Sequence, residues 1–192
     1  MERLSIIQMP ANGYIDTDEL TLIEVARVDP AAFKELYGKY FDRIYRYIWF
    51  RVSTPEDAAD LTQQVFMQAF NSLPKYQNRG LPFSAWLFRI ARNKLVDASR
   101  QRRPDISWEN LPEPVQPHDD LNPEGAMLRQ EALNDLRRMV AQLDSEKREL
   151  LSLRFAADLS SREIAAVVGK SEAAVKKQLT RIIQTLKENT HV

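Results

Sequence analysis

The stretch DLSSREIAAVVGKSEAAVKKQLTR, residues 158–181, decides the fold of the C-terminal part of the chain. Ser160 and Glu163 have the spacing of a capping box, which predicts the start of a helix. Gly169 suits the left-handed conformation that ends a helix, and Ser171 predicts the cap of a second helix. The pattern therefore predicts two helices joined by a tight turn, a helix-turn-helix.

The second of these helices has an apolar side and a basic side. The residues expected to be buried are Val175, Leu179, Ile182, Ile183 and Leu186. Lys176, Lys177, Thr180 and Arg181 fall on the other side, where they suit phosphates and base edges. A basic second helix of this kind can enter the major groove of DNA. The alternative is an ordinary helical hairpin with a solvated basic face.

Composition excludes several classes of protein. The 192 residues are 44% hydrophobic and include no cysteine, which excludes disulfides, thiolate metal sites and cysteine nucleophiles. There is no run of 18 apolar residues and no signal-peptide pattern, so we expect a cytoplasmic chain without membrane insertion. The two histidines, His118 and His191, have no plausible metal ligands beside them on an ordered element. We therefore expect no metal, no cofactor and no catalytic residue.

Charge is segregated although the net charge is zero. Residues 79–103 hold seven Lys or Arg and one acid, and residues 159–187 hold six Lys or Arg and two acids. Between them, residues 104–126 hold six acids, no Lys or Arg, and five of the ten prolines. Two basic blocks around an acidic bridge favour two contacts with a polyanion.

Helical spacing and cap signals predict an all-α protein of two small helical domains. Cap signals predict helices over about 17–28, from Asp29, from Thr54 to Ser72, and from Pro82 to Arg102, and then over 123–142 and 145–156. The expected division is a first domain over 15–103, a Pro-rich acidic linker over 104–123, and a second domain over 124–188. Trp108, Leu111 and Val115 leave two readings of the linker open: a disordered tether, or a strand that competes with nucleic acid.

The predicted third helix carries Asp57, Asp60, Gln64 and Gln68 on one face, opposite apolar residues that include Phe70. From the residues alone, this pattern fits helix-dipole complementation on a solvated face or a docking surface for a basic partner.

The predicted fourth helix mixes cations and aromatic rings. Arg89, Arg92 and Asn93 lie close to Phe83, Trp86 and Phe88, and Tyr76 precedes them. Cations and flat rings together suit a single-stranded nucleic acid, because the backbone meets charge and the bases meet π-faces. The alternative is that the aromatic residues form core, and burial of Phe83 and Trp86 is at least as plausible as base contact.

These pieces in this order resemble the extracytoplasmic-function sigma factors of bacterial RNA polymerase, which have only the conserved regions 2 and 4. The resemblance is carried by DPAAFKELYGKY, DAADLTQQVFMQAFNSL, FSAWLFRIARNKLVDASRQRR and the helix-turn-helix, and it covers about residues 18–187. It implies a factor that binds core RNA polymerase, through the β′ coiled coil and the β flap, and directs initiation at promoter DNA. It also implies an anti-sigma partner.

The resemblance also implies three sets of site residues. Positions that contact polymerase are Asp57, Asp60, Leu61, Gln63, Gln64, Val65 and Phe66. Positions that contact melted minus-ten DNA are Tyr76, Asn78, Arg79, Phe88, Arg89, Arg92 and Asn93. Positions that contact minus-35 duplex are Ser171, Glu172, Ala173, Lys176, Lys177, Thr180 and Arg181.

The chain departs from the family pattern at three places. Gln64 replaces a common glutamate, Lys170 replaces an apolar residue of the turn, and Ala174 replaces a usual threonine. Rival readings are a helix-turn-helix regulator that acts without polymerase, an enzyme, and a protein-only adaptor that blocks sigma. The regulator would bind duplex DNA tightly by itself, and the adaptor would tolerate loss of the basic residues.

Overall fold

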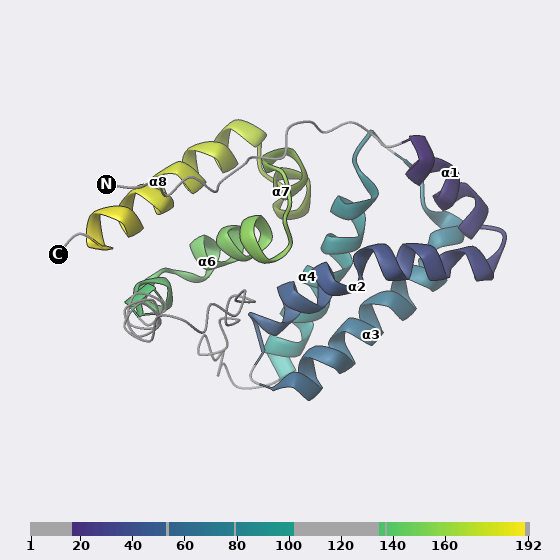
Figure 1. Cartoon of the computed structure of the whole chain (residues 1–192), viewed down its shortest axis with the longest axis horizontal. Helices are drawn as coiled ribbons and strands as arrows, with labels where there is room; N and C mark the ends of the chain where they lie inside the picture. Colours follow the sequence, from purple (N-terminus) through teal and green to yellow (C-terminus); the bar gives the residue numbers. More distant parts are fainter. Residues whose placement is uncertain (1–16, 53, 79, 102–134, 137, 191–192) are drawn as a thin grey trace, which may run out of the picture.

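The computed structural model describes residues 17–52, 54–78, 80–101, 135–136 and 138–190 (Figure 1). Throughout these residues the secondary structure is helical, with turns and no strand, so the predicted all-α class is confirmed. The linker predicted over 104–123, with its three apolar residues, lies outside the described residues. So do Arg79, both histidines, and the first part of the helix expected over 123–142.

The N-terminal helices begin where the sequence places their caps. They are α1 (Thr17–Ala26), the 3₁₀ turn η1 (Pro30–Ala32), α2 (Phe33–Trp49), α3 (Pro55–Ser72), the 3₁₀ turn η2 (Leu73–Lys75) and α4 (Phe83–Gln101). The carboxylate of Asp29 accepts from Ala31 N at 2.9 Å, and the hydroxyl of Thr54 accepts from Asp57 N at 3.1 Å. Each such cap satisfies an N–H that the first helical turn leaves unpaired.

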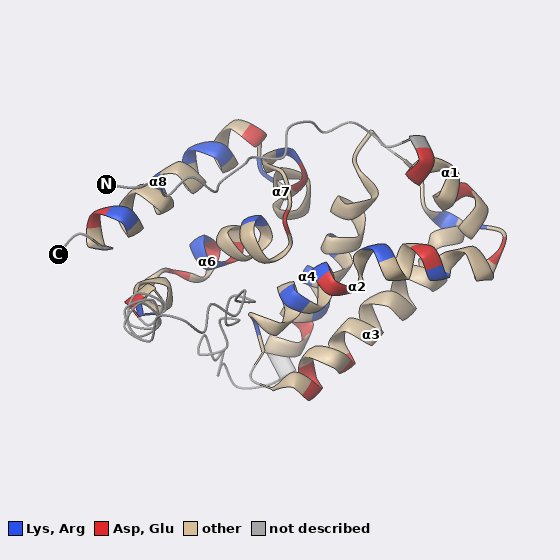
Figure 2. Cartoon of the chain, viewed as in Figure 1, with Lys and Arg blue, Asp and Glu red and all other residues tan. Residues whose placement is uncertain are grey.

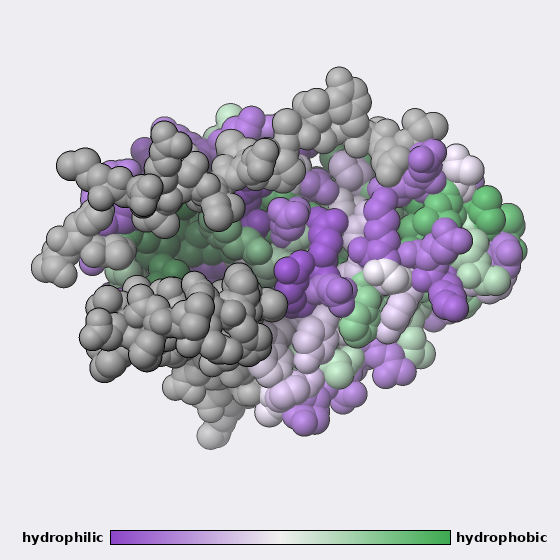
Figure 3. All heavy atoms as spheres, viewed as in Figure 1, coloured by the Kyte–Doolittle hydropathy of each residue, from purple (hydrophilic) through white to green (hydrophobic). Residues whose placement is uncertain are grey.

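Helices α2, α3 and α4 pack around a common core, with α1 against α2 (Figure 1). Ile44, Ile48 and Val65 are fully buried in it. Phe70, which helical spacing places on the inner side, is instead 40% exposed. It lies in the last turn of α3, beside Phe33 at a ring separation of 5.2 Å, where the bundle ends and one side of the ring meets solvent. Figure 3 shows hydrophobic surface at the α1 end, where Val25 and Val28 are exposed.

The C-terminal helices are α6 (Ser145–Leu151), α7 (Ser161–Val168) and α8 (Glu172–Thr190), and residues 135, 136 and 138–142 are also helical. The helix expected over 145–156 changes after Leu151 into a π-helical turn, η3 (Ser152–Ala156). Asp158 follows with φ +50, a left-handed conformation. This combination turns the chain sharply from η3 into α7.

The capping signals of the helix-turn-helix are confirmed atom by atom. Ser160 Oγ accepts from Glu163 N at 3.3 Å, and Glu163 Oε2 accepts from Ser160 N at 2.8 Å. Gly169 has φ +74, and its N–H donates to Ala165 O at 2.9 Å. The hydroxyl of Ser171 accepts from Ala174 N at 3.2 Å, so the second helix is capped as predicted.

The N-terminal and C-terminal helices touch directly. Helix α4 packs on α7, and α2 packs on η3, so the buried residues of both groups form one continuous cluster. The division into domains near residues 103 and 124 stays a prediction. This direct packing determines what surrounds the candidate site.

Candidate nucleic-acid interface

Helix α8 presents the predicted minus-35 residues along one side. Val175, Leu179 and Ile182 are buried against α6 and α7. The residues exposed to solvent are Ser171, Ala173, Lys176, Lys177, Thr180 and Arg181, with Glu172 half-buried. Figure 2 shows the resulting basic bands on this helix. The geometry leaves these cations accessible to a polyanion.

One ion pair links Glu172 and Lys176, which are one helical turn apart at the start of α8. Lys176 Nζ lies 2.7 Å from Glu172 Oε1, four residues earlier, and the two side chains are 64% and 43% exposed. Exposed pairs of this kind contribute about 0.3–0.5 kcal/mol. A phosphate can therefore displace Glu172 from Lys176 at small cost.

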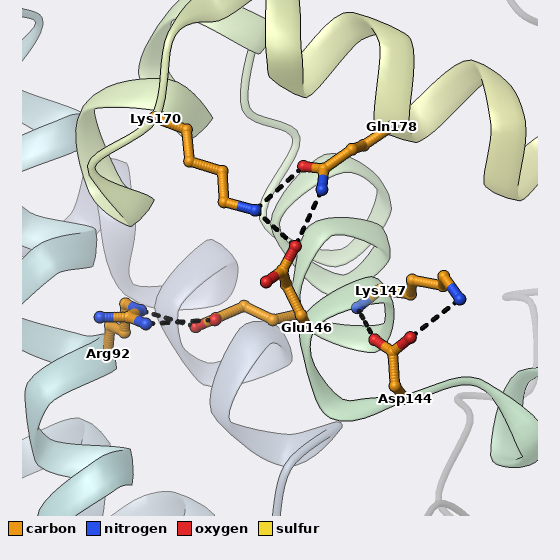
Figure 4. Close-up of polar contacts among 7 residues, drawn as sticks. Arg92, Asp144, Glu146, Lys147, Lys170 and Gln178 are labelled. Atoms are coloured by element: carbon orange, nitrogen blue, oxygen red, sulfur yellow. Dashed lines mark hydrogen bonds and ion pairs between the residues drawn. The ribbon is translucent and has the colours of Figure 1, made fainter.

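Lys170, the departure in the turn, has polar partners rather than an apolar pocket. Its ammonium contacts Glu146 Oε1 and lies 3.2 Å from Gln178 Oε1, while Gln178 Nε2 donates to Glu146 at 2.9 Å (Figure 4). The bond from Lys170 holds the pKa of Glu146 below its ordinary value. This cluster ties the turn to α6 and α8, so the substitution changes the chemistry of the turn without loosening it.

A cavity of about 440 Å³ lies at the start of α4, at the position of the predicted minus-ten loop. It is lined by Ser72, Lys75, Tyr76, Gln77, Leu81, Pro82, Ala85, Trp86 and Arg89. The rings of Tyr76 and Trp86 are 4.9 Å apart, and Tyr76 also meets Phe83 edge-on at 5.5 Å. Tyr76 is 7% exposed, and burial raises its pKa. The site therefore combines an aromatic wall with cationic and amide groups.

The loop beside this cavity is stabilised by a hydrogen bond between a side chain and the backbone of the same loop. Asn78 Oδ1 accepts from Gly80 N at 2.9 Å, and Gly80 has φ +74. Lys75 and Trp86 line the cavity but are absent from the set predicted by resemblance. Lys75 directly precedes Tyr76 in sequence, so the position of Tyr76 is the signal that could have identified Lys75.

Helix α4 separates the predicted minus-ten residues into three environments. Asn93 is exposed. Arg89 is exposed and donates to Ala166 O of α7, and Arg92 Nε donates to Glu149 Oε1 of α6 at 2.9 Å. The hydrogen bond that Arg92 donates to Glu149 raises the pKa of Arg92, so Arg92 stays charged.

Phe88 requires a correction in this arrangement. It was expected to face DNA, but it is fully buried, with its ring 5.5 Å from that of Tyr47. The Arg43 guanidinium lies 5.7 Å from its centroid. Phe88 faces the side of α4 on which α2 and the C-terminal helices meet, and apolar packing there outweighs exposure.

The predicted polymerase-contact residues of α3 also divide by burial. Asp60, Gln63 and Gln64 are exposed and Asp57 is half-buried. The other three, Leu61, Val65 and Phe66, lie in the core at 9%, 0% and 4% exposure. Helical spacing points these three side chains inward. We therefore revise their predicted role from direct contact with polymerase to packing beneath the exposed face of α3.

Neighbouring apolar groups on the same side were missed by sequence reasoning. Met67 is 58% exposed, and Tyr37 of α2 is 40% exposed, with its ring 4.6 Å from that of Phe66. Tyr37, Phe41, Tyr45 and Trp49 follow one another every four residues on α2, with successive ring separations of 5.2, 6.0 and 6.2 Å. That spacing is the signal that could have identified this aromatic row.

No membrane-spanning candidate occurs among the helices of the described ranges. Within the same ranges, no cluster of three or more metal-ligating side chains is present.

Two family models match the chain on either side of its acidic bridge. Sigma-70 region 2 matches residues 36–104, and Sigma-70 region 4 matches residues 133–186. The chain is 32% identical over 176 residues to the ECF RNA polymerase sigma factor SigD of Mycobacterium tuberculosis, covering 88% of this chain and 82% of SigD. The chain belongs to the extracytoplasmic-function sigma factors. Sigma factors are transcription-initiation factors, so membership places this chain outside the enzymes.

Other relatives support the same family membership. The sigma factor is 35% identical over 176 residues to BldN of Streptomyces coelicolor, covering 87% of this chain and 64% of BldN. Among solved structures, CnrH in complex with the cytosolic domain of CnrY aligns with a TM-score of 0.59 and 26% identity over 90% of this chain and 96% of that one. RpoE bound to the anti-sigma factor NepR, from Bartonella quintana, has the same TM-score at 23% identity, over 83% of this chain and 97% of that one, and supports the fold alone. The match to region 2 disfavours a helix-turn-helix regulator that acts without polymerase.

Proposed function

We propose that this sigma factor directs core RNA polymerase to promoters through two separate DNA contacts. Helix α8 reads the minus-35 duplex, and the cavity at the start of α4 captures an unpaired base of the minus-ten element. The observation that carries the proposal is the presence, in one chain, of an exposed basic recognition helix and a cavity walled by aromatic and cationic groups. A regulator that binds only duplex DNA needs the recognition helix but not the cavity.

On duplex DNA, some exposed residues of this surface would position the helix by binding phosphates, and others would read base edges. Lys176, Lys177 and Arg181 supply charge for phosphates or guanine edges, and Ser171 and Thr180 supply hydroxyls. Ala173 is a small exposed residue that allows close approach or contact with a thymine methyl group. The carboxylate of Glu172 can accept from a cytosine amino group once Lys176 turns to a phosphate.

In the melted region, the cavity offers a flipped base both of the interactions it needs. The rings of Tyr76 and Trp86 provide an apolar wall, worth about 1–3 kcal/mol per base by stacking. Lys75, Gln77 and Arg89 supply polar groups at the rim. Unstacking costs a few kcal/mol, so capture of one base offsets much of the cost of opening.

Polymerase docking is assigned to the exposed face of α3, with Asp60, Gln63 and Gln64 toward the β′ coiled coil and the C-terminal helices toward the β flap. CnrH is bound to the cytosolic domain of CnrY in its solved structure, and we extend a partner of the anti-sigma type to this chain. Work with polymerase requires a cytoplasmic location. Promoter selectivity then belongs to the holoenzyme.

Runoff transcription with purified core enzyme tests the proposal. Genomic fragments should give discrete start sites with the sigma factor and none without it. The Arg89→Ala, Asn93→Ala double variant should still assemble with core but give a weaker permanganate-reactive bubble at those start sites. A normal bubble in that variant would remove α4 from strand capture, and an absence of start-site selectivity with the wild-type chain would refute the function.

A further inference from the structure

We propose that α1 positions the aromatic wall of the minus-ten cavity, through Arg27 at its end and Glu19 in its first turn. The inference rests on the proposed function for the role of that cavity. Helix α1 precedes residues 36–104, which match Sigma-70 region 2, and none of the predicted site residues lies in it. Its contacts nevertheless lead to both rings of the wall, Tyr76 and Trp86.

The first contact joins Arg27 to η2, the turn that leads into the cavity. Arg27 directly follows α1, and its N–H continues the helical pattern by donating to Ile23 O at 3.0 Å. Its Nη2 donates to Pro74 O at 3.3 Å, while its Nη1 donates to the two carboxylate oxygens of Glu24 at 3.1 and 2.8 Å. A planar guanidinium holds such acceptors in a fixed geometry. Arg27 therefore ties η2 to α1 just before Tyr76.

The turn η2 transmits this position to the cavity. Tyr76 N donates to Leu73 O at 2.9 Å, which closes the turn around Pro74. Leu73 is 1% exposed, so the start of the turn is fixed in the core. Lys75 and Tyr76, which follow Pro74, both line the cavity. A shift of the Pro74 carbonyl would consequently move two lining residues.

The second contact starts at Glu19 and reaches the same wall by another route. Tyr40 of α2, which is 2% exposed, donates its hydroxyl to Glu19 Oε1 at 2.5 Å. The ring of Tyr40 lies 5.6 Å from that of Phe83, the first residue of α4. Phe83 in turn lies 5.5 Å from Tyr76 and 5.1 Å from Trp86. One hydrogen bond from α1 therefore fixes the ring on which the wall packs.

The charges of α1 also act on the cavity. Burial is the largest cause that raises the pKa of Tyr76, and the negative charges of Glu19 and Glu24 raise it further. The phenol therefore stays neutral and keeps its proton for a hydrogen bond. Lys39 Nζ lies 2.8 Å from Glu19 Oε1, so Glu19 keeps an ion pair when the Tyr40 hydroxyl is removed.

A helix in this place could instead stabilise the fold alone. A loss of stability affects every activity of the chain, whereas a loss of positioning affects only binding that uses the cavity. The two roles therefore differ in whether assembly with core polymerase and capture of melted DNA change together.

Dissociation of the holoenzyme from premelted DNA tests the inference. The DNA is a start site found by runoff transcription, made non-complementary over its minus-ten region so that no melting energy enters. Arg27→Ala removes the donor to Pro74 O, and Tyr40→Phe removes the donor to Glu19 but keeps the ring. Each variant should dissociate about tenfold faster, a change of about 1.4 kcal/mol, because a displaced wall stacks poorly on the base. Arg27→Lys, which keeps a donor, should restore most of the lifetime.

Ile48→Val is the matched control for stability. Ile48 is fully buried in the last turn of α2, and none of the contacts that lead from α1 to the cavity uses it. Loss of one methylene group should lower the melting temperature and leave the lifetime on premelted DNA unchanged. All variants should co-purify with core polymerase like wild type.

A double-variant cycle separates positioning from any other effect. Trp86→Leu removes one ring of the wall and should itself shorten the lifetime. If Arg27 acts through that wall, Arg27→Ala should add little on the Trp86→Leu background. Equal effects of Arg27→Ala with and without Trp86 would show that Arg27 acts elsewhere and would overturn the inference.

Two other results have clear meanings. Wild-type lifetimes for the Arg27→Ala and Tyr40→Phe chains, with circular dichroism showing that both are folded, would also overturn the inference. Failure of the proposed function has a different signature. In that case the wild-type holoenzyme itself would hold the premelted DNA no longer than the matching duplex.

Discussion

Glu146 and Glu149 lie three residues apart on α6, yet their carboxylates serve different parts of the molecule. Glu146 holds the turn of the helix-turn-helix through Lys170 and Gln178 (Figure 4). Glu149 instead pairs with Arg92 and Arg51 of the N-terminal part of the chain. The difference between the two is burial: Glu146 is exposed and Glu149 is buried. The Glu146 pair therefore lies at the surface, whereas the Glu149 carboxylate is enclosed between the two groups of helices.

Glu146→Gln should alter how stability depends on pH. The hydrogen bond from Lys170 lowers the pKa of Glu146 in the folded state, so its stabilising effect is complete above the ordinary glutamate pKa of about 4.3 and is lost as pH falls through the lowered value. The melting temperature of the variant should lie below that of wild type at neutral pH. The difference should shrink in acid, and a difference that stays constant across the titration would contradict this role.

Lys176→Ala should weaken binding of the holoenzyme to promoter duplex and reduce the salt slope by about one counterion. Its ammonium is exposed on α8 and needs only to leave Glu172 to meet a phosphate. Fluorescence anisotropy over a salt series gives the slope. Lys34→Ala, an exposed lysine of α2, is the control and should leave the slope unchanged. An unchanged slope in the Lys176 variant would remove the phosphate assignment.

At the scale of elements, the helix-turn-helix depends on one backbone conformation. Gly169 has φ +74, and this left-handed residue aligns α7 and α8 so that the basic side of α8 stays outside. Around Gly169 a Cβ would meet nothing within 4 Å, so the cost of a side chain there is conformational rather than steric. Gly38 of α2 has equally open space, and no left-handed φ is found there.

Gly169→Ala should therefore lower the free energy of unfolding by roughly 1–2 kcal/mol, the cost of a left-handed non-glycine residue. Gly38→Ala should instead raise it by about 0.5–1 kcal/mol, because alanine is favoured in a helix interior. Urea titrations of the two variants make the comparison. Equal effects of the same sign would show that the turn does not depend on the left-handed conformation.

At the scale of the whole molecule, the surfaces that we propose for DNA and for polymerase face different neighbours. The cations of α4 lie against α6 and α7, whereas Asp60, Gln63 and Gln64 of α3 lie in solvent.

Asp60→Arg should reduce co-purification with core polymerase at least tenfold, because it reverses charge at the centre of the exposed α3 face. Asp97→Arg, the same reversal on an exposed position of α4, is the control and should retain binding. Thermal unfolding of both variants should match wild type. Normal assembly of the Asp60 variant would place the polymerase contact elsewhere.

Local signals were sufficient for much of the fold. The caps at Asp29, Thr54 and Ser160, and the left-handed Gly169, depend on residues within a few positions of one another, so sequence spacing predicts them. Helical periodicity likewise identified most of the core of α3 and α8. It failed at Phe70, because periodicity does not report where a bundle ends.

The sequence by itself determined the helices, their caps, the basic side of α8 and the family, because each rests on contacts or patterns that are local along the chain. Only the tertiary structure decided that Phe88 is buried, that Arg89 and Arg92 bond to α7 and α6, and that Tyr76 and Trp86 wall a cavity. These features join residues far apart in sequence. Whether a cation faces solvent or a buried carboxylate depends on which helices pack together, and no local pattern contains that information.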